Sequence, residues 1–151
     1  MQVSARDQAT LSRAAVILEK IAKSQPQHVV QDPAAAANIF RHRLSGLKRE
    51  EFHVAFLSNT NYLIAAERMF LGTLSQCAVY PREIVRRALD LNAAAIVLAH
   101  NHPSGVLEPS EADKRLTSAL RDACYMVDVR VLDHIIVAGG ATLSFASKGL
   151  L

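Results

Sequence analysis

The chain has 151 residues, 50% of them hydrophobic, 21% charged and 5% aromatic, and a formal net charge of +3 at pH 7. This size and composition are typical of one soluble globular domain with its own core, and we expect no second large domain. The longest apolar stretch, residues 93–99, is far shorter than the roughly 20 residues that cross a bilayer, and residues 1–7 contain no apolar signal core, so we expect a cytoplasmic protein without membrane contact.

Two helices are predicted near the N-terminus. Apolar side chains recur at helical spacing over residues 7–24, with polar residues between them, which is typical of an amphipathic helix. Asp32 and Pro33 form a helix start, because an N-cap residue precedes a proline at the first helical position, and the helix can continue to Leu44. We treat residues 1–44 as a helical N-terminal extension.

Basic residues concentrate in the first third of the chain. Residues 1–49 hold eight Lys or Arg against three acids, whereas residues 50–151 hold nine against eleven. A solvated helix face is the commoner reason for such a concentration, and contact with nucleic acid or another acidic partner is the alternative. Under that alternative, nucleic acid is an expected partner of the basic helices in residues 1–44.

The hydrophobic period changes from helical to alternating at Glu51. The alternation over residues 52–56 predicts a strand, the polar residues 58–61 a turn, and residues 62–66 a second strand, which together form an antiparallel hairpin. A short strand is predicted over residues 75–79. A helix then begins at Pro81, followed by apolar residues at helical spacing.

The second half of the chain alternates between strand and helix patterns. Residues 94–99 are apolar and partly β-branched, as in a buried strand, and residues 110–124 predict an amphipathic helix that buries Leu116, Ala119, Leu120 and Ala123. Residues 127–132 alternate as a strand, which Asp133 and His134 interrupt. The order of elements predicts an α/β fold, with a mixed sheet flanked by helices.

Two histidines follow the buried strand with one residue between them. Side chains two residues apart on a strand point to the same face, with Cα atoms about 7 Å apart, so His100 and His102 can hold one cation between them. Asp113, after a loop rich in proline and glycine, can supply an oxygen ligand. Three protein ligands with an open fourth position are the arrangement of a catalytic zinc site.

The residues from Ser110 to Asp113 also have a structural interpretation. A serine followed three residues later by an acid resembles a helix capping box, in which Ser110 accepts from first-turn amides and Asp113 lies at the positive end of the helix. For these two residues alone the capping interpretation is favoured. For the whole set of histidines, loop and carboxylate, metal binding is favoured.

The same residues resemble the RadC family. The quoted motifs are His-Asn-His-Pro-Ser-Gly at 100–105 with Ser110 and Asp113 after it, Pro81-Arg82-Glu83 before it, and Leu132-Asp133-His134-Ile135-Ile136-Val137 near the C-terminus. The resemblance covers about residues 45–151 and extends to the JAB/MPN metalloprotease domain, whose JAMM motif reads as an upstream Glu, then HxH, then Ser and Asp. It implies a RadC-like JAB/MPN domain over residues 45–151, built on a curved mixed sheet between helices and similar to cytidine deaminases.

Full-length members of the RadC family carry a helix-hairpin-helix region before this domain. Residues 1–44 are too short for that region and lack its glycine hairpin. The chain therefore resembles the short RadC form found near mobile genetic elements. Its HxH string has Asn101 in the middle, as in RadC proteins, where many eukaryotic deubiquitinase relatives have Ser or Thr.

The resemblance implies that His100, His102 and Asp113 bind Zn²⁺, with water as the fourth ligand. A bound divalent cation lowers the pKa of such a water to about 7, which supplies a nucleophile near neutral pH. The implied activity is that of a zinc-dependent hydrolase, similar to metallopeptidases and isopeptidases, with a peptide or protein substrate.

The family pattern also places a glutamate at the start of the first strand of the hairpin, where Glu50 and Glu51 are both candidates. We choose Glu50 as the general base, because it shares strand parity with the apolar residues 52, 54 and 56, and keep Glu51 as the alternative. The resemblance further implies that Ser110 helps to stabilise the oxyanion of the reaction.

Two other functions stay open. One is a nucleic-acid-associated module, linked to mobile elements or to DNA repair, the historical label of the family; the other is a non-enzymatic interaction scaffold. Deaminase chemistry is set aside, because its HxE and PCxxC motifs do not occur. Cys77 and Cys124 have no common ligand spacing and are expected to be reduced thiols.

His134 stands beside Asp133 at the end of the predicted strand. Such a pair can orient a ligand through a carboxylate–imidazole contact, as partners of metal-binding histidines do. It can equally be a structural pair without a role in a site. We favour the structural pair.

Overall fold

The computed structural model describes residues 6–7, 10, 13–14, 16–17, 28–73 and 77–151. The elements bounded within this part run along the chain as α2 (Pro33–Leu44), β1 (Glu51–Leu57), β2 (Leu63–Leu71), α3 (Pro81–Asp90), β3 (Ala95–Asn101), α4 (Glu111–Tyr125), β4 (Arg130–Ala138) and β5 (Ala141–Ser144). Most of the helix predicted over residues 7–24 lies outside the described residues.

The strands of the described residues form one five-stranded sheet in the order β2-β1-β3-β4-β5. The β3–β4 pair is parallel, and the other three pairs are antiparallel. This mixed sheet with helices on its faces confirms the predicted α/β fold class. β3 lies in the middle, and all seven of its residues are buried, which explains its continuous apolar sequence.

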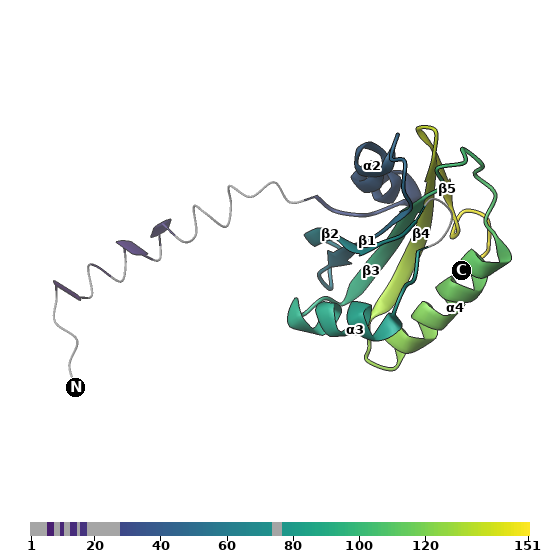
Figure 1. Ribbon diagram of the computed structural model, residues 1–151. Helices are drawn as coiled ribbons and strands as arrows, with labels where there is room; N and C mark the ends of the chain where they lie inside the picture. Colours follow the sequence, from purple (N-terminus) through teal and green to yellow (C-terminus); the bar gives the residue numbers. More distant parts are fainter. Residues whose placement is uncertain (1–5, 8–9, 11–12, 15, 18–27, 74–76) are drawn as a thin grey trace.

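Helices cover both faces of the sheet (Figure 1). α2 packs on one face, where Phe40 and Leu44 belong to a buried cluster that includes residues of β1, β3 and β4. α3 and α4 pack on the other face, where Ile84 and Leu120 belong to a second cluster with residues of β1 and β3. Among the described residues, every helix is too short or too polar to cross a bilayer.

α2 starts and ends as its sequence predicts. The side chain of Asp32 accepts a hydrogen bond from the backbone N–H of Ala35 at 2.7 Å, and Pro33 occupies the first turn. The sequence analysis assigns α2 to the N-terminal extension, but the helix shares a core with the sheet. The physical reason is Phe40, whose side chain is completely buried against the strands.

The interruption predicted at Asp133 and His134 is wrong, because β4 runs unbroken through both residues. Its register against β3 shifts between Val131 and Asp133, so that Leu132 forms a β-bulge. Polar side chains do not end a strand whose backbone groups remain paired with a neighbour, and a bulge re-aims the side chains that follow it. Downstream of the bulge, His134 faces the same side of the sheet as Val131.

Two smaller expectations also differ from the structure. Residues 77–79 are not in a strand, and residues 74–76 lie outside the described part. On α4, Ala119 is exposed, whereas Thr117, Leu120 and Cys124 are buried. The buried side chains follow the helical spacing of three and four residues, so Thr117 lies on the face of α4 that contacts the sheet.

Candidate metal centre

The two histidines of the HxH motif lie at the end of the central strand. His100 is the penultimate residue of β3, and His102 follows the strand directly. Their Nε2 atoms are 2.9 Å apart. The His100 ring is buried and lies nearly parallel to the ring of Phe52 on β1, with 6.1 Å between centroids and 12° between planes. The strand therefore places both imidazoles on the same side of the sheet, as their spacing predicts.

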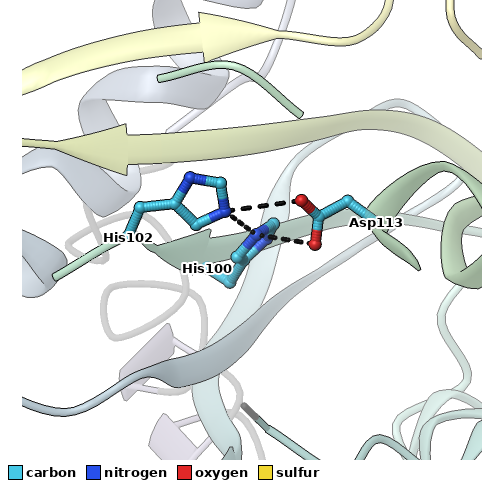
Figure 2. A group of neighbouring side chains, drawn as sticks. All are labelled: His100, His102 and Asp113. Carbon is cyan, nitrogen blue, oxygen red and sulfur yellow. Dashed lines mark hydrogen bonds and ion pairs between the residues drawn. The ribbon is translucent and has the colours of Figure 1, made fainter. Parts of the chain in front are cut away.

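Asp113 approaches the histidines from the first turn of α4 (Figure 2). Its Oδ1 atom lies 3.2 Å from Nε2 of His100, and its Oδ2 atom lies 3.4 Å from Nε2 of His102. The three side chains offer ligand atoms that all lie within 4.8 Å of one another. Residues separated by 11 or 13 positions in the chain thus converge on one point.

The capping box predicted at the start of α4 is present as well. The backbone N–H of Ser110 donates to Oδ2 of Asp113 at 2.8 Å, and the Ser110 hydroxyl accepts from the backbone N–H of Asp113 at 3.1 Å. The structural and the metal-binding interpretations are therefore compatible. The cap orients the carboxylate of Asp113, and the carboxylate so oriented faces the two histidines.

Asp113 and His102 shift each other's pKa. Burial acts to raise the pKa of Asp113, but contacts with His100 and His102 hold that pKa well below its ordinary value. The contact with Asp113 in turn raises the pKa of His102. Asp113 is consequently a carboxylate throughout the neutral range, the form in which it can bind a cation.

One ring nitrogen of His102 takes part in a hydrogen bond to the backbone. Its Nδ1 atom lies 2.6 Å from the backbone carbonyl oxygen of Val106. Because a carbonyl oxygen only accepts, Nδ1 carries a proton and donates it, which leaves Nε2 as the nitrogen that can bind a metal ion. Gly105, at φ +81°, permits the tight turn between His102 and Val106, a left-handed conformation that favours glycine.

Glu50 lies at the same cavity, one residue before β1. It lines a cavity of about 700 Å³ together with His100, His102 and Asp113. Burial raises the pKa of Glu50 above its ordinary value, and the two histidines oppose this effect. Its backbone N–H donates to the carbonyl of Thr73 at 3.0 Å, so the residue is anchored beside the end of β2.

The alternative candidate, Glu51, points elsewhere. Its carboxylate contacts Nε2 of His53 at 2.8 Å and Nη1 of Arg68 at 3.2 Å. Burial acts to raise the pKa of Glu51, but the contacts with His53 and Arg68 outweigh this effect, so the pKa lies below its ordinary value. The two glutamates are thus separated, and of the two only Glu50 lines the cavity with His100 and His102.

Asn101, between the two histidines, holds the segment that carries Glu50. Its side-chain oxygen accepts from the backbone N–H of Glu51 at 2.8 Å, and its amide donates to the backbone carbonyl of Arg49 at 2.9 Å. The sequence analysis assigned Asn101 no contact. Strand parity could have shown that Asn101 faces away from His100, but its partners at Arg49 and Glu51 depend on the pairing of β1 with β3.

A second missed residue is His134, which the sequence analysis favoured as a structural partner of Asp133. The Asp133 carboxylate instead accepts from Ser144 and from backbone N–H groups, including that of His134. The His134 ring lies 2.8 Å from Nδ1 of His100 and 2.6 Å from the hydroxyl of Thr117. Complete burial holds the pKa of His134 well below its ordinary value.

A family model of a RadC-like JAB domain matches residues 30–150, which is most of the chain. The chain belongs to the RadC family. A UPF0758 protein of Methylibium petroleiphilum is 54% identical over 123 residues, which cover 82% of this chain and 55% of that protein. A UPF0758 protein of Nitrosospira multiformis is 51% identical over 144 residues, covering 95% and 63% respectively. The chain thus spans little more than half the length of these curated relatives.

Ser110 of this RadC-like JAB domain offers a test of the capping box. We expect Ser110→Ala to lower the free energy of unfolding by about 1 kcal/mol, because it removes a side-chain N-cap. Metal affinity should stay close to that of the unchanged protein, since the backbone N–H of Ser110 still holds Asp113. Urea denaturation and a metal titration check the two expectations. A large loss of metal affinity would show that the hydroxyl, and not the backbone, orients the carboxylate.

Proposed function

We propose that this protein is a zinc-dependent hydrolase that cleaves a peptide or isopeptide bond. The observation that carries the proposal is the convergence of ligand atoms from His100, His102 and Asp113 within 4.8 Å. Membership of the RadC-like JAB family supports it. The bond that is cleaved and the use of zinc are parts of the proposal.

The donor set fits zinc. Imidazole nitrogens and a carboxylate oxygen are ligands that Zn²⁺ binds at about 2.0–2.2 Å in tetrahedral geometry, which places neighbouring ligand atoms about 3.3 Å apart. The contacts among the three side chains measure 2.9, 3.2 and 3.4 Å. Three protein ligands leave a fourth position for water or substrate, as in catalytic zinc sites. When bound, the ion would act as a Lewis acid that polarises the scissile carbonyl and acidifies water.

Glu50 is the proposed general base. Its partly buried carboxyl group lies at the cavity beside the ligands, and its raised pKa brings it closer to the pH at which it works. The carboxylate accepts a proton from the attacking water and delivers it to the nitrogen that leaves, which are the two proton transfers of amide hydrolysis. Anchoring of the flanking backbone by Asn101 and Thr73 would keep Glu50 in position.

Ser110 is the proposed donor to the oxyanion. Among the hydrogen bonds of the described residues, its hydroxyl takes part only as an acceptor, from the backbone N–H of Asp113. Its own proton is therefore available to a substrate oxygen in the cavity that Ser110 lines. A donor aimed at developing negative charge is a common source of catalysis in acyl transfer.

The cavity suits part of an extended chain rather than a whole folded domain. Its volume of about 700 Å³ lies within the roughly 300–1,000 Å³ of typical ligand sites. Its walls include Val79, Val106 and Leu116, which offer apolar contacts around the polar centre. A peptide segment that presents one amide to the centre is the substrate class we propose.

The proposal is tested by metal analysis combined with a cleavage assay. Protein purified without chelator should contain about one zinc per chain by elemental analysis. It should cleave members of a peptide library or a fluorogenic lysine-linked isopeptide, lose this activity with a chelator, and regain it with added zinc. A wild-type protein that neither contains nor binds zinc would refute the metal centre, and cleavage that resists chelation would refute the mechanism.

A further inference from the structure

A buried series of hydrogen bonds leads from α4 to Nδ1 of the His100 ring. The Thr117 hydroxyl contacts the backbone carbonyl of Asp113 at 2.6 Å and Nδ1 of His134 at 2.6 Å. Nε2 of His134 then contacts Nδ1 of His100 at 2.8 Å. Thr117, His134 and His100 are 2%, 0% and 1% exposed, so water does not compete for these bonds. These hydrogen bonds thus join two of the proposed ligands, Asp113 and His100, through groups that do not face the cavity.

The donor and the acceptor of each hydrogen bond can be assigned, starting from the backbone carbonyl of Asp113. A backbone carbonyl only accepts, so the Thr117 hydroxyl donates its single proton to Asp113; without that proton, two oxygens would lie 2.6 Å apart and repel. Toward His134 the same hydroxyl can only accept. Nδ1 of His134 must therefore carry a proton and donate it.

The proton positions on His134 and His100 follow in the same way. A neutral imidazole has one ring proton, so His134 with a proton on Nδ1 has a bare Nε2 that accepts from Nδ1–H of His100. With its proton held on Nδ1, His100 in the neutral form presents a lone pair on Nε2. Nε2 of His102 is bare as well, so its 2.9 Å distance from Nε2 of His100, and the 3.2 Å from His100 to the Asp113 carboxylate, suit atoms that share one cation.

We infer that His134 and Thr117 are positioning residues, which hold His100 in the tautomer and orientation that present Nε2 to a zinc ion. The inference rests on the proposed metal centre and adds to it a pair of residues outside the ligand set. Partners of this kind usually are carboxylates or backbone carbonyls, and their loss typically costs 10- to 100-fold in metal affinity. Here a neutral histidine takes the place of the carboxylate.

The fold explains how His134 reaches this position. Without the bulge at Leu132, strand alternation would turn His134 to the face covered by α2, opposite to Val131. The extra residue reverses the alternation, so that His134 lies between His100 on β3 and Thr117 on α4. The bulge therefore determines which side chain of β4 contacts His100.

The test compares zinc dissociation constants, measured by competition with a chelating dye, in variants of the full chain. His134→Phe retains a buried aromatic ring but removes the acceptor for Nδ1–H of His100, and we expect it to weaken zinc binding about 10- to 100-fold. His134→Gln, whose amide oxygen can accept the same bond, should recover part of that loss. Ile135→Val, a mild change in the neighbouring buried residue on the opposite face, should leave zinc affinity unchanged.

Thr117→Val is a second variant, in case His134→Phe does not fold. It keeps the side-chain shape, removes the hydroxyl that orients His134, and should also weaken zinc binding. Nitrogen-15 spectra of histidine-labelled protein add a readout of the tautomer, because the hydrogen-bonded Nδ1–H of His100 should be seen in the wild type and lost in His134→Phe. Equal zinc affinity in the wild type, His134→Phe and Thr117→Val would overturn the inference while leaving the metal centre intact. A wild type without zinc affinity would instead refute the proposed function.

Discussion

Replacement of Asp113 by alanine is expected to weaken zinc binding by more than about 100-fold, because loss of a ligand should exceed the 10- to 100-fold cost of losing a ligand's hydrogen-bond partner. Asp113 contributes the carboxylate that faces both histidines, with contacts of 3.2 and 3.4 Å. Contacts with His100 and His102 hold the pKa of Asp113 well below its ordinary value, so the side chain is a carboxylate at neutral pH. Titration with zinc against a competing chelator measures the effect.

Two controls separate this effect from damage to α4. Asp113→Ala also removes the acceptor for the backbone N–H of Ser110, so part of the cap is lost. Asp113→Asn keeps an oxygen that can cap the helix but lacks the charge, and it should retain more stability while still binding zinc poorly. Glu111→Gln removes a neighbouring carboxylate that pairs with Lys114, away from the histidines, and should leave zinc affinity unchanged. Equal affinity in Asp113→Ala and Glu111→Gln would refute the ligand role of Asp113.

Replacement of Glu50 by glutamine is expected to lower kcat by about 10²- to 10⁴-fold, the usual contribution of a general acid–base group. Zinc content should not change, because Glu50 lines the cavity but is not among the converging ligand atoms. Glutamine has nearly the same shape and cannot take up the proton of the attacking water. Turnover of the peptide found in the library assay, together with zinc analysis, measures both quantities.

The matched control is Glu51→Gln, one residue further along the chain. Its carboxylate contacts His53 and Arg68 and does not line the cavity. This change should affect stability slightly and turnover little. If Glu51→Gln abolished turnover and Glu50→Gln did not, the assignment of the base would be reversed.

Much of the fold was predictable from local patterns. The start of α2 at Asp32 and Pro33, the hairpin after Glu51 and the buried strand before His100 all follow from periodicity and capping residues, which act within a few positions of the chain. The interruption predicted within β4 was wrong for a physical reason. A strand is held by backbone bonds to its neighbours, and the polar side chains of Asp133 and His134 find partners on other elements, Ser144 of β5 and Thr117 of α4.

In the candidate site, too, some relations follow from local sequence patterns and others from tertiary packing. By itself, the sequence determined that His100 and His102 lie on one side of a strand and that Ser110 and Asp113 cap the following helix, because spacings of two and three residues set these relations locally. Only the tertiary structure decided that the cap faces the histidines, that Glu50 rather than Glu51 lies beside them, and that His134 and Thr117 support His100. These relations depend on the register between strands, the bulge at Leu132 and the packing of α4, which arise from contacts across the whole sheet.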